Sequence, residues 1–542
     1  MTRSTSSLIA LLLLSISARE SVAQVHVHPA MQVDSTGLGM VSFPNSGKAA
    51  AQASFLRGVA MLHSFEHQDA AAAFRDAQRI DPAFALAYWM QALTNRQELW
   101  GTEQLVAARA TLARLGPDAK SRIAKARTPR EKQFGAAVEA LFADMPEAQR
   151  VRSWSDSLNS YVSREPADAE WASFAAVAIM DAMRWLSPAE RVRARDSSAA
   201  LAERVFAAYP SHPGGAHFVI HANDDPVNAP RAERAARMYA RIAPASDHAL
   251  HMPSHIFMQL GLWDDAATSN ERAWEASVAE AEKSGVASSV SWHALNWLEY
   301  AYLQQGRHRA ARALLDTALR RMGARSDTLP GIDPKFSLEE MRFMYAAHTG
   351  DWAWDAGTEI RLAERSTRGV MREVAQMYRS AVTSQMRGMV ARAVPDRLVA
   401  YADSVADSQS ARSAKAWGQH LAATLAARSA SRSAAIEALR AHAGIDTAAP
   451  NGPTSRLVTA ELLGQLLLAE GRGAEAVTAF EQSLRLHPRR SPALLGLARA
   501  RKMTGDRAGA ARAYRDLLVN WHTADTDLPE LAEAKAGALL AN

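Results

Sequence analysis

Apolar residues follow a helical pattern that begins near residue 47 and continues almost to the C-terminus. They recur about every three to four positions, which is the spacing of one face of an α-helix. No run shows a convincing alternation of apolar and polar residues, the signature of a half-buried strand. The pattern therefore predicts an all-α protein.

Small, aromatic and proline residues recur at fixed offsets within this pattern. One set is Gly58, Ala70, Phe74, Ala77 and Pro82; a second is Gly464, Ala476, Phe480 and Pro488. Ala510 and Tyr514 stand 34 residues after Ala476 and Phe480. A tetratricopeptide repeat (TPR) is a helix–turn–helix of about 34 residues that needs small residues where its helices touch. The sequence predicts a TPR-like α-solenoid, a right-handed superhelix of helical hairpins with a concave groove.

The N-terminus has the features of a signal peptide. Arg3 supplies a positive charge, Leu8 to Ile16 form a short apolar run, and Ser21-Val22-Ala23 is a small-x-small cleavage site. A membrane anchor or a buried helix is the alternative, but the apolar run is too short to span a bilayer comfortably. We expect a periplasmic or secreted protein with no stable membrane span after cleavage.

Stretches rich in proline and glycine predict where one segment of the chain ends and the next begins. Pro450, Asn451, Gly452 and Pro453 mark the best linker. The expected segments are a signal peptide (1–23), a flexible N-terminal segment (24–46), a TPR-like solenoid with a central histidine cluster (47–445), a linker (446–455) and a C-terminal TPR pair (456–542).

Composition excludes several classes of function. The chain has no cysteine, so disulfides, thiolate ligands and cysteine nucleophiles are excluded. Its 62 Lys and Arg barely outnumber its 57 Asp and Glu and are interspersed with them, which argues against nucleic acid as a partner. No phosphate loop or nucleotide fingerprint is present, so no nucleotide cofactor is expected.

Six of the 17 histidines lie between residues 212 and 255. They form two segments, one with His212, His217 and His221 and one with His248, His251 and His255. Pro213 and Pro253 should mark helix starts. Both segments then read as first helices of adjacent repeats, which line the groove. His217 and His221 share one face at i, i+4; His255 falls in a first helical turn, with His248 and His251 on the chain entering it.

This constellation predicts a transition-metal site. The principal ligands are His217, His221, His251 and His255, and the supporting candidates are His212, His248, His293, Asp224 and Asp225. Neutral imidazole suits Zn, Cu, Fe or Ni. Whether the protein is an enzyme stays open. The alternatives are a non-catalytic scaffold that binds a protein or peptide in its groove and uses structural histidines, a metal-dependent hydrolase or oxidase, and metal-free acid–base chemistry by the imidazoles.

The histidine motifs carry a family resemblance. His-Pro-Gly-x-x-His-x-x-x-His from His212 and His-x-x-His-Met-Pro-Ser-His-Ile-Phe from His248, followed by the segment from His293, resemble a group of exported bacterial TPR proteins. The resemblance covers residues 50–365 and implies a TPR-like fold centred on the histidines, without supplying a reaction. That group commonly has an acidic residue at the position of Asn296, which weakens the case for a carboxylate ligand there.

Two weaker patterns are better explained by packing. His63-Ser64-Phe65-Glu66-His67 matches the inverted zincin spacing His-x-x-Glu-His. It falls at the expected turn between two helices, so it should not form one ligand-bearing helix. The aromatic residues Trp292, Trp297, Tyr300 and Tyr302 should pack between helices, and beside His293 they would add an apolar wall to the groove.

Overall fold

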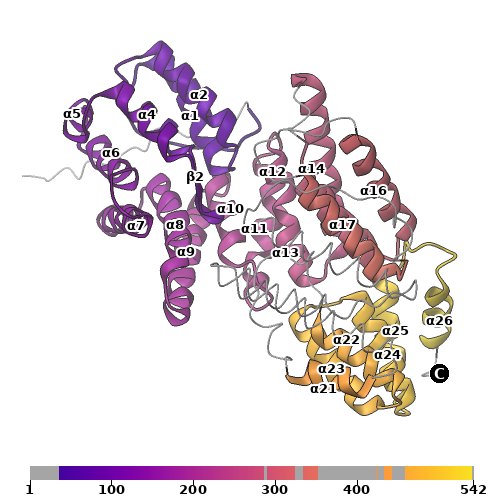
Figure 1. Cartoon of the computed structure of the whole chain (residues 1–542). Helices are drawn as coiled ribbons and strands as arrows, with labels where there is room; N and C mark the ends of the chain where they lie inside the picture. The colour runs from indigo at the N-terminus through magenta and orange to yellow at the C-terminus, as the bar shows by residue number, and fades with distance from the viewer. Residues whose placement is uncertain are drawn as a thin grey trace, which may run out of the picture.

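The structure, a computed structural model, describes residues 36–285, 290–323, 334–351, 423, 432–441 and 458–539. In this part of the chain, antiparallel helix hairpins follow one another (Figure 1). The N-terminal helices are α1 (Ala49–His63), α2 (His67–Ile80), α3 (Ala85–Leu93), α4 (Leu105–Leu115), α5 (Ala119–Ala124), α6 (Pro129–Leu141), α7 (Glu147–Arg164), α8 (Ala169–Ala182) and α9 (Pro188–Ala208). A small antiparallel pair of strands, β1 (Arg96–Gln97) and β2 (Thr102–Glu103), interrupts them.

The central helices continue the same arrangement. They are α10 (Pro213–Ala222), α11 (Ala229–Ile242), α12 (Asp247–His251), α13 (Pro253–Leu260), α14 (Trp263–Ser284), α15 (Trp292–Gln304), α16 (His308–Gly323) and α17 (Pro334–Thr349). The C-terminal helices are α21 (Arg432–Ala441), α22 (Thr459–Ala469), α23 (Gly473–Leu486), α24 (Ser491–Met503), α25 (Arg507–Asn520) and α26 (Pro529–Gly537). The predicted all-α, TPR-like solenoid is confirmed; the β1–β2 pair was not expected.

Glycine and alanine let the helices of a hairpin approach an aromatic ring closely. A Cβ atom on Gly58 of α1 would lie 2.6 Å from the ring of Phe74 on α2, and one on Gly464 of α22 would lie 2.7 Å from the ring of Phe480 on α23. Real Cβ atoms do not approach that closely, so the contact requires glycine. The repeat signature in the sequence is therefore a packing requirement.

The segment before α1 is packed against the helices rather than flexible. In its described part, residues 36–46, the side chains of Leu38, Val41 and Phe43 are buried. The amide of Met40 donates to the carbonyl of Ser211 at 2.8 Å. The prediction of a flexible N-terminal segment is wrong for these residues because the apolar side chains among its glycines and prolines have a core to enter.

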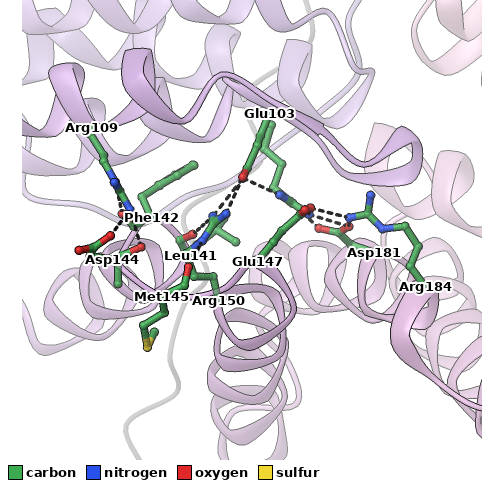
Figure 2. Close-up of polar contacts among 12 residues, drawn as sticks. Glu103, Arg109, Leu141, Phe142, Asp144, Met145, Glu147, Arg150, Asp181 and Arg184 are labelled. Carbon is green, nitrogen blue, oxygen red and sulfur yellow. Dashed lines mark hydrogen bonds and ion pairs between the residues drawn. The ribbon is translucent and has the colours of Figure 1, made fainter. Parts of the chain in front are cut away.

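A buried arginine ties the β1–β2 pair to the neighbouring helices. Arg96 is fully buried and donates to both carboxylate oxygens of Asp181 on α8, at 2.6 and 3.0 Å, and to Glu103 at 2.8 Å. Figure 2 shows Glu103 also facing Arg150, and Asp181 facing Arg184. The network neutralises a guanidinium that has no contact with water.

The C-terminal repeats dock onto the central helices. The indole of Trp263 donates to the carbonyl of Arg489 at 2.9 Å, and the amide of Ser491 donates to Gln304 at 2.9 Å. Arg490 donates to the hydroxyl of Tyr300. These contacts hold the helices α22–α23 and α24–α25 to the body (Figure 1).

The predicted signal peptide and linker lie outside the described residues. Among the helices that are described, none combines the length and the apolar character needed to cross a membrane. Thr128 and Glu131 form a capping box at the start of α6.

We expect Gly58→Ala to destabilise the first hairpin. The added methyl group would overpack against the buried ring of Phe74, and the gain in helix propensity offsets only part of that cost, leaving a net loss of about 1–2 kcal/mol. Urea unfolding followed by circular dichroism measures the change. Arg57→Ala, at the exposed neighbouring position, is the control and should stay within about 0.5 kcal/mol of wild type.

We expect Asp181→Asn to cost about 3–5 kcal/mol, because it leaves the buried Arg96 without its closest counter-charge. Burial raises the pKa of Asp181 to about 6, against the opposing effect of Arg96 and Arg184, so the comparison belongs at pH 8, where the carboxylate is ionised. The control Asp144→Asn removes a fully exposed partner of Arg109 and should change stability by less than about 0.5 kcal/mol. Equal losses in the two variants would refute the argument.

Candidate metal centre

Three histidines from two helices form what we call the first triad. His217 and His221 lie one turn apart on α10, and His248 lies on α12. One ring nitrogen from each lies within 4.8 Å of the other two. His217 is fully buried, while His221 and His248 are partly exposed.

Three further histidines form the second triad. His251 ends α12, His255 lies in the first turn of α13, and His293 lies in the first turn of α15. Their ring nitrogens also lie within 4.8 Å of one another. His251 is buried, and His255 and His293 are partly exposed.

Capping residues fix where the helices that carry these histidines begin. The ring of His212 accepts a hydrogen bond from the amide of Gly215 and caps α10, and Ser246 caps α12 by accepting from the amide of Ala249 at 3.1 Å. Pro213 and Pro253 occupy first-turn positions, as predicted. His248 and His251 lie on the chain that enters α13, and this chain forms the separate short helix α12. Ser246 caps α12 before Pro253 begins the next helix.

Three of the six rings are held through Nδ1. His217 donates to the backbone carbonyl of His63 at 2.6 Å. His251 donates to the amide oxygen of Asn270 at 2.6 Å, and His255 donates to the carboxylate of Asp224 at 2.7 Å. A carbonyl or carboxylate can only accept, so in each ring Nδ1 carries the proton and neutral imidazole leaves a lone pair on Nε2.

Two Nε2 atoms face each other inside each triad. Nε2 of His217 lies 3.0 Å from Nε2 of His248, and Nε2 of His251 lies 3.2 Å from Nε2 of His255. Two nitrogen ligands of one tetrahedral zinc ion are about 3.3 Å apart, given Zn–N bonds of about 2.0–2.1 Å. In the pair of His251 and His255, both neutral rings would direct lone pairs at each other, an arrangement that a shared cation stabilises.

Burial keeps most of these rings in the neutral, ligand-competent form. It lowers the pKa of His217 to about 3, against the hydrogen bond to His63. Burial, reinforced by neighbouring imidazoles, also lowers the pKa of His221, His248 and His251 well below the usual value. These rings therefore do not have to lose a proton near neutral pH before binding a metal ion.

Each triad packs against one aromatic side chain. The ring of Phe65 lies 4.5 Å from His217 and 5.6 Å from both His221 and His248, between centroids. Trp297 lies 4.2–5.2 Å from the three rings of the second triad. Phe65 has a φ of 58°, which is unusual for a residue other than glycine. Backbone strain of this kind persists where the surroundings hold it, and it concentrates at functional sites.

A third group, His63, Glu170 and His212, is fully buried and joined by hydrogen bonds through its carboxylate. Glu170 faces the Nε2 atoms of His63 and His212 at 2.7 and 3.2 Å. His212 uses Nδ1 to accept from Gly215, so its Nε2 carries the proton that Glu170 accepts. Burial raises the pKa of Glu170, but His212 and His63 hold it well below its usual range. His212 thus supports α10 and belongs to neither triad.

The structure redistributes the predicted ligands. His217 and His221 fall in the first triad and His251 and His255 in the second, so they do not form a single four-histidine site. His248 and His293, predicted as supporting residues, complete the triads. Asp224 orients His255, whereas Asp225 accepts from the amides of Val227 and Asn228.

The remaining sequence patterns also have a place. Asn296 donates to Glu340 at 2.7 Å. The segment His63–His67 spans the end of α1 and the start of α2, as expected, and forms no zincin-like helix.

Phe65 and Asn270 were not predicted as site residues. The sequence does contain a periodic signal that relates the two triads. His251 and His255 follow His217 and His221 by 34 residues, one TPR period.

Comparisons with known proteins bear on the fold alone. No protein-family model matches the chain, and no curated protein matches it. Similar solved structures include the Cut9–Hcn1 hetero-tetramer of APC/C, with 10% identity over 92% of this chain and 77% of that chain and a TM-score of 0.38. Yeast Tom70 is 10% identical over 89% and 88%, with a TM-score of 0.27, and the P58(IPK) TPR domain is 12% identical over 91% and 98%, with a TM-score of 0.21.

A buried carboxyl group lies farther along the helix that carries His293. Glu299 on α15 is fully buried, and neither of its carboxylate oxygens has a hydrogen-bond partner in the described part of the chain. Burial, together with the neighbouring Glu340, raises its pKa well above the usual value. The folded protein therefore holds a proton at Glu299 that the unfolded chain releases above about pH 4.5.

We expect Glu299→Gln to become more stabilising, relative to wild type, as pH rises from 5 to 9. The raised pKa makes the wild type lose stability with rising pH, by at most about 1.4 kcal/mol per pH unit, and glutamine removes that loss. Melting temperatures across the pH series measure it. The exposed control Glu275→Gln should show no such trend, and a pH-independent difference for Glu299→Gln would contradict the assignment.

Proposed function

We propose that this protein is a metalloprotein in which a TPR-like solenoid holds two transition-metal ions, one in each histidine triad. One observation carries the proposal. One ring nitrogen of each histidine converges with the others in each triad, while Nδ1 of His217, His251 and His255 is held by a carbonyl, an amide oxygen and a carboxylate. Metal-ligating histidines are typically oriented by such partners through the other ring nitrogen.

The ligand chemistry narrows the class of metal. Each triad offers three imidazoles, and the carboxylate of Asp224 bonds to a ligand ring rather than standing among the ligands. Imidazole suits copper, zinc, nickel and iron, whereas magnesium, calcium and manganese prefer oxygen ligands. Three protein ligands also leave a coordination position for water or substrate, as in catalytic metal sites. Metal-assisted hydrolysis or oxidation of a small molecule is the chemistry this arrangement would support.

The fold itself favours a second role that does not exclude the first. Stacked hairpins form extended surfaces, and TPR arrays generally mediate protein interactions. The expected signal peptide would place both roles outside the cytoplasm. A protein or peptide partner would then meet a repeat scaffold that also carries the metal ions.

The double variant His217→Ala/His255→Ala tests the metal proposal, because it removes one ligand from each triad. After dialysis against Zn(II) and removal of the excess, we expect elemental analysis to find zinc in wild type and little in the variant. Free Zn(II) at about one hundred times its Kd should stabilise wild type by about 2.7 kcal/mol for each occupied triad, seen as a higher melting temperature.

The control His522→Ala changes a half-exposed histidine outside both triads and should bind zinc as wild type does. Circular dichroism of the metal-free proteins shows whether the double variant folds. The proposal fails if wild type retains no metal and its melting temperature is unchanged by Zn(II), Cu(II) and Ni(II). It also fails if the folded double variant retains as much metal as wild type.

A further inference from the structure

The nearest rings of the two triads are about as far apart as the most widely separated rings within each triad. Between triads, the ring centroids of His221 and His255 are 6.0 Å apart, and those of His248 and His251 are 6.4 Å apart. Within triads, His221 and His248 are 6.4 Å apart and His255 and His293 are 6.2 Å apart. The six imidazoles therefore form one continuous cluster.

The elements that carry the triads are interlocked. The short helix α12 provides His248 to the first triad and His251 to the second, so one rigid turn sets the distance between them. Asp224 follows α10, the helix of the first triad, yet its carboxylate orients His255 of the second. A change in one triad is therefore transmitted to the other through backbone and hydrogen bonds.

We infer that the two triads form a single dinuclear centre, in which two metal ions share one small bridging oxygen anion, hydroxide in the resting state. This inference rests on the proposed function. Dinuclear protein sites hold their ions about 3.5–4 Å apart, a separation that one oxygen atom spans. Three imidazoles on each ion leave the position that the bridge occupies.

Charge explains why the bridge is an anion. Two divalent ions bring four positive charges into a cluster whose six imidazole ligands are neutral, and Asp224 is the carboxylate bonded to one of these rings. A water molecule bound to both ions loses one proton to solvent, and the oxygen keeps the electron pair of the broken O–H bond and binds both ions. A single zinc ion already lowers the pKa of bound water to about 7.

The exposure of the rings fits this exchange with solvent. His217 and His251 are buried, but His221, His248, His255 and His293 are partly exposed. The cluster therefore has one side closed by protein and one side that water and small anions reach. Phe65 and Trp297 cover the rings with apolar surface, which strengthens electrostatic attraction between the ions and the bridge.

Copper provides a test that distinguishes one coupled centre from two independent sites. We expect metal-free wild type titrated with Cu(II) to bind two copper ions per chain. A bridging oxygen couples their unpaired electrons, so the electron paramagnetic resonance signal at low temperature should integrate to a small fraction of the bound copper. The titration should also release protons beyond those released by the single-triad variants.

The variants remove one partly exposed ligand from each triad in turn. His221→Ala and His293→Ala should each reduce the bound copper to one ion that gives the full signal of one unpaired electron. His522→Ala, outside the cluster, should keep the wild-type stoichiometry and the weak signal. If an alanine variant does not fold, the asparagine variant at the same position replaces it.

The other possible results of the copper titration contradict the dinuclear centre. Two copper ions with the full signal of two unpaired electrons would show independent sites and overturn the dinuclear centre, while the proposed function would stand. One copper ion per wild-type chain would overturn it as well. If wild type binds no copper, and zinc and nickel also fail to bind, the proposed function itself is refuted.

Discussion

Close packing between small residues and aromatic rings determines how the hairpins stack, and with it where the histidines of the two triads lie. Gly58 against Phe74, and Gly464 against Phe480, bring the helices of a hairpin closer than any residue with a Cβ atom would allow. Repeating hairpins place equivalent positions of successive first helices side by side. Histidines one repeat apart in sequence thereby become neighbours in space, and a site of six imidazoles needs no ligand-binding loop.

Proton placement distinguishes the triads from the third histidine group. Around Glu170, a carboxylate accepts the protons of two buried rings, and every contact is a conventional hydrogen bond. In the second triad, His251 and His255 both direct Nδ1 at acceptors outside the triad and face each other through Nε2. The same residue type thus forms a structural network in one place and an arrangement suited to a cation in another.

The sequence was sufficient for the fold and for most of the cluster, but not for its grouping. Periodicity and small-to-aromatic offsets are local signals, and they predicted the hairpins and the helix starts at Pro213 and Pro253. The grouping depends on distances between repeats. His248 joins the first triad because Ser246 starts a separate helix, and Asn270 orients His251 from the following helix. Neither contact leaves a pattern in the neighbouring residues, whereas the 34-residue offset between histidine pairs does.

Helix α15 contacts both the second triad and the C-terminal repeats. Its first turn provides His293 to the second triad, and its last turns bond to the C-terminal repeats through Tyr300 and Gln304. Any partner that moved α15 when it bound the C-terminal repeats would alter the affinity for metal. Thermodynamic linkage makes the effect mutual, so metal occupancy would change the affinity for that partner by the same factor. Helix α15 would in this way couple the proposed metal centre to the surface of the C-terminal repeats.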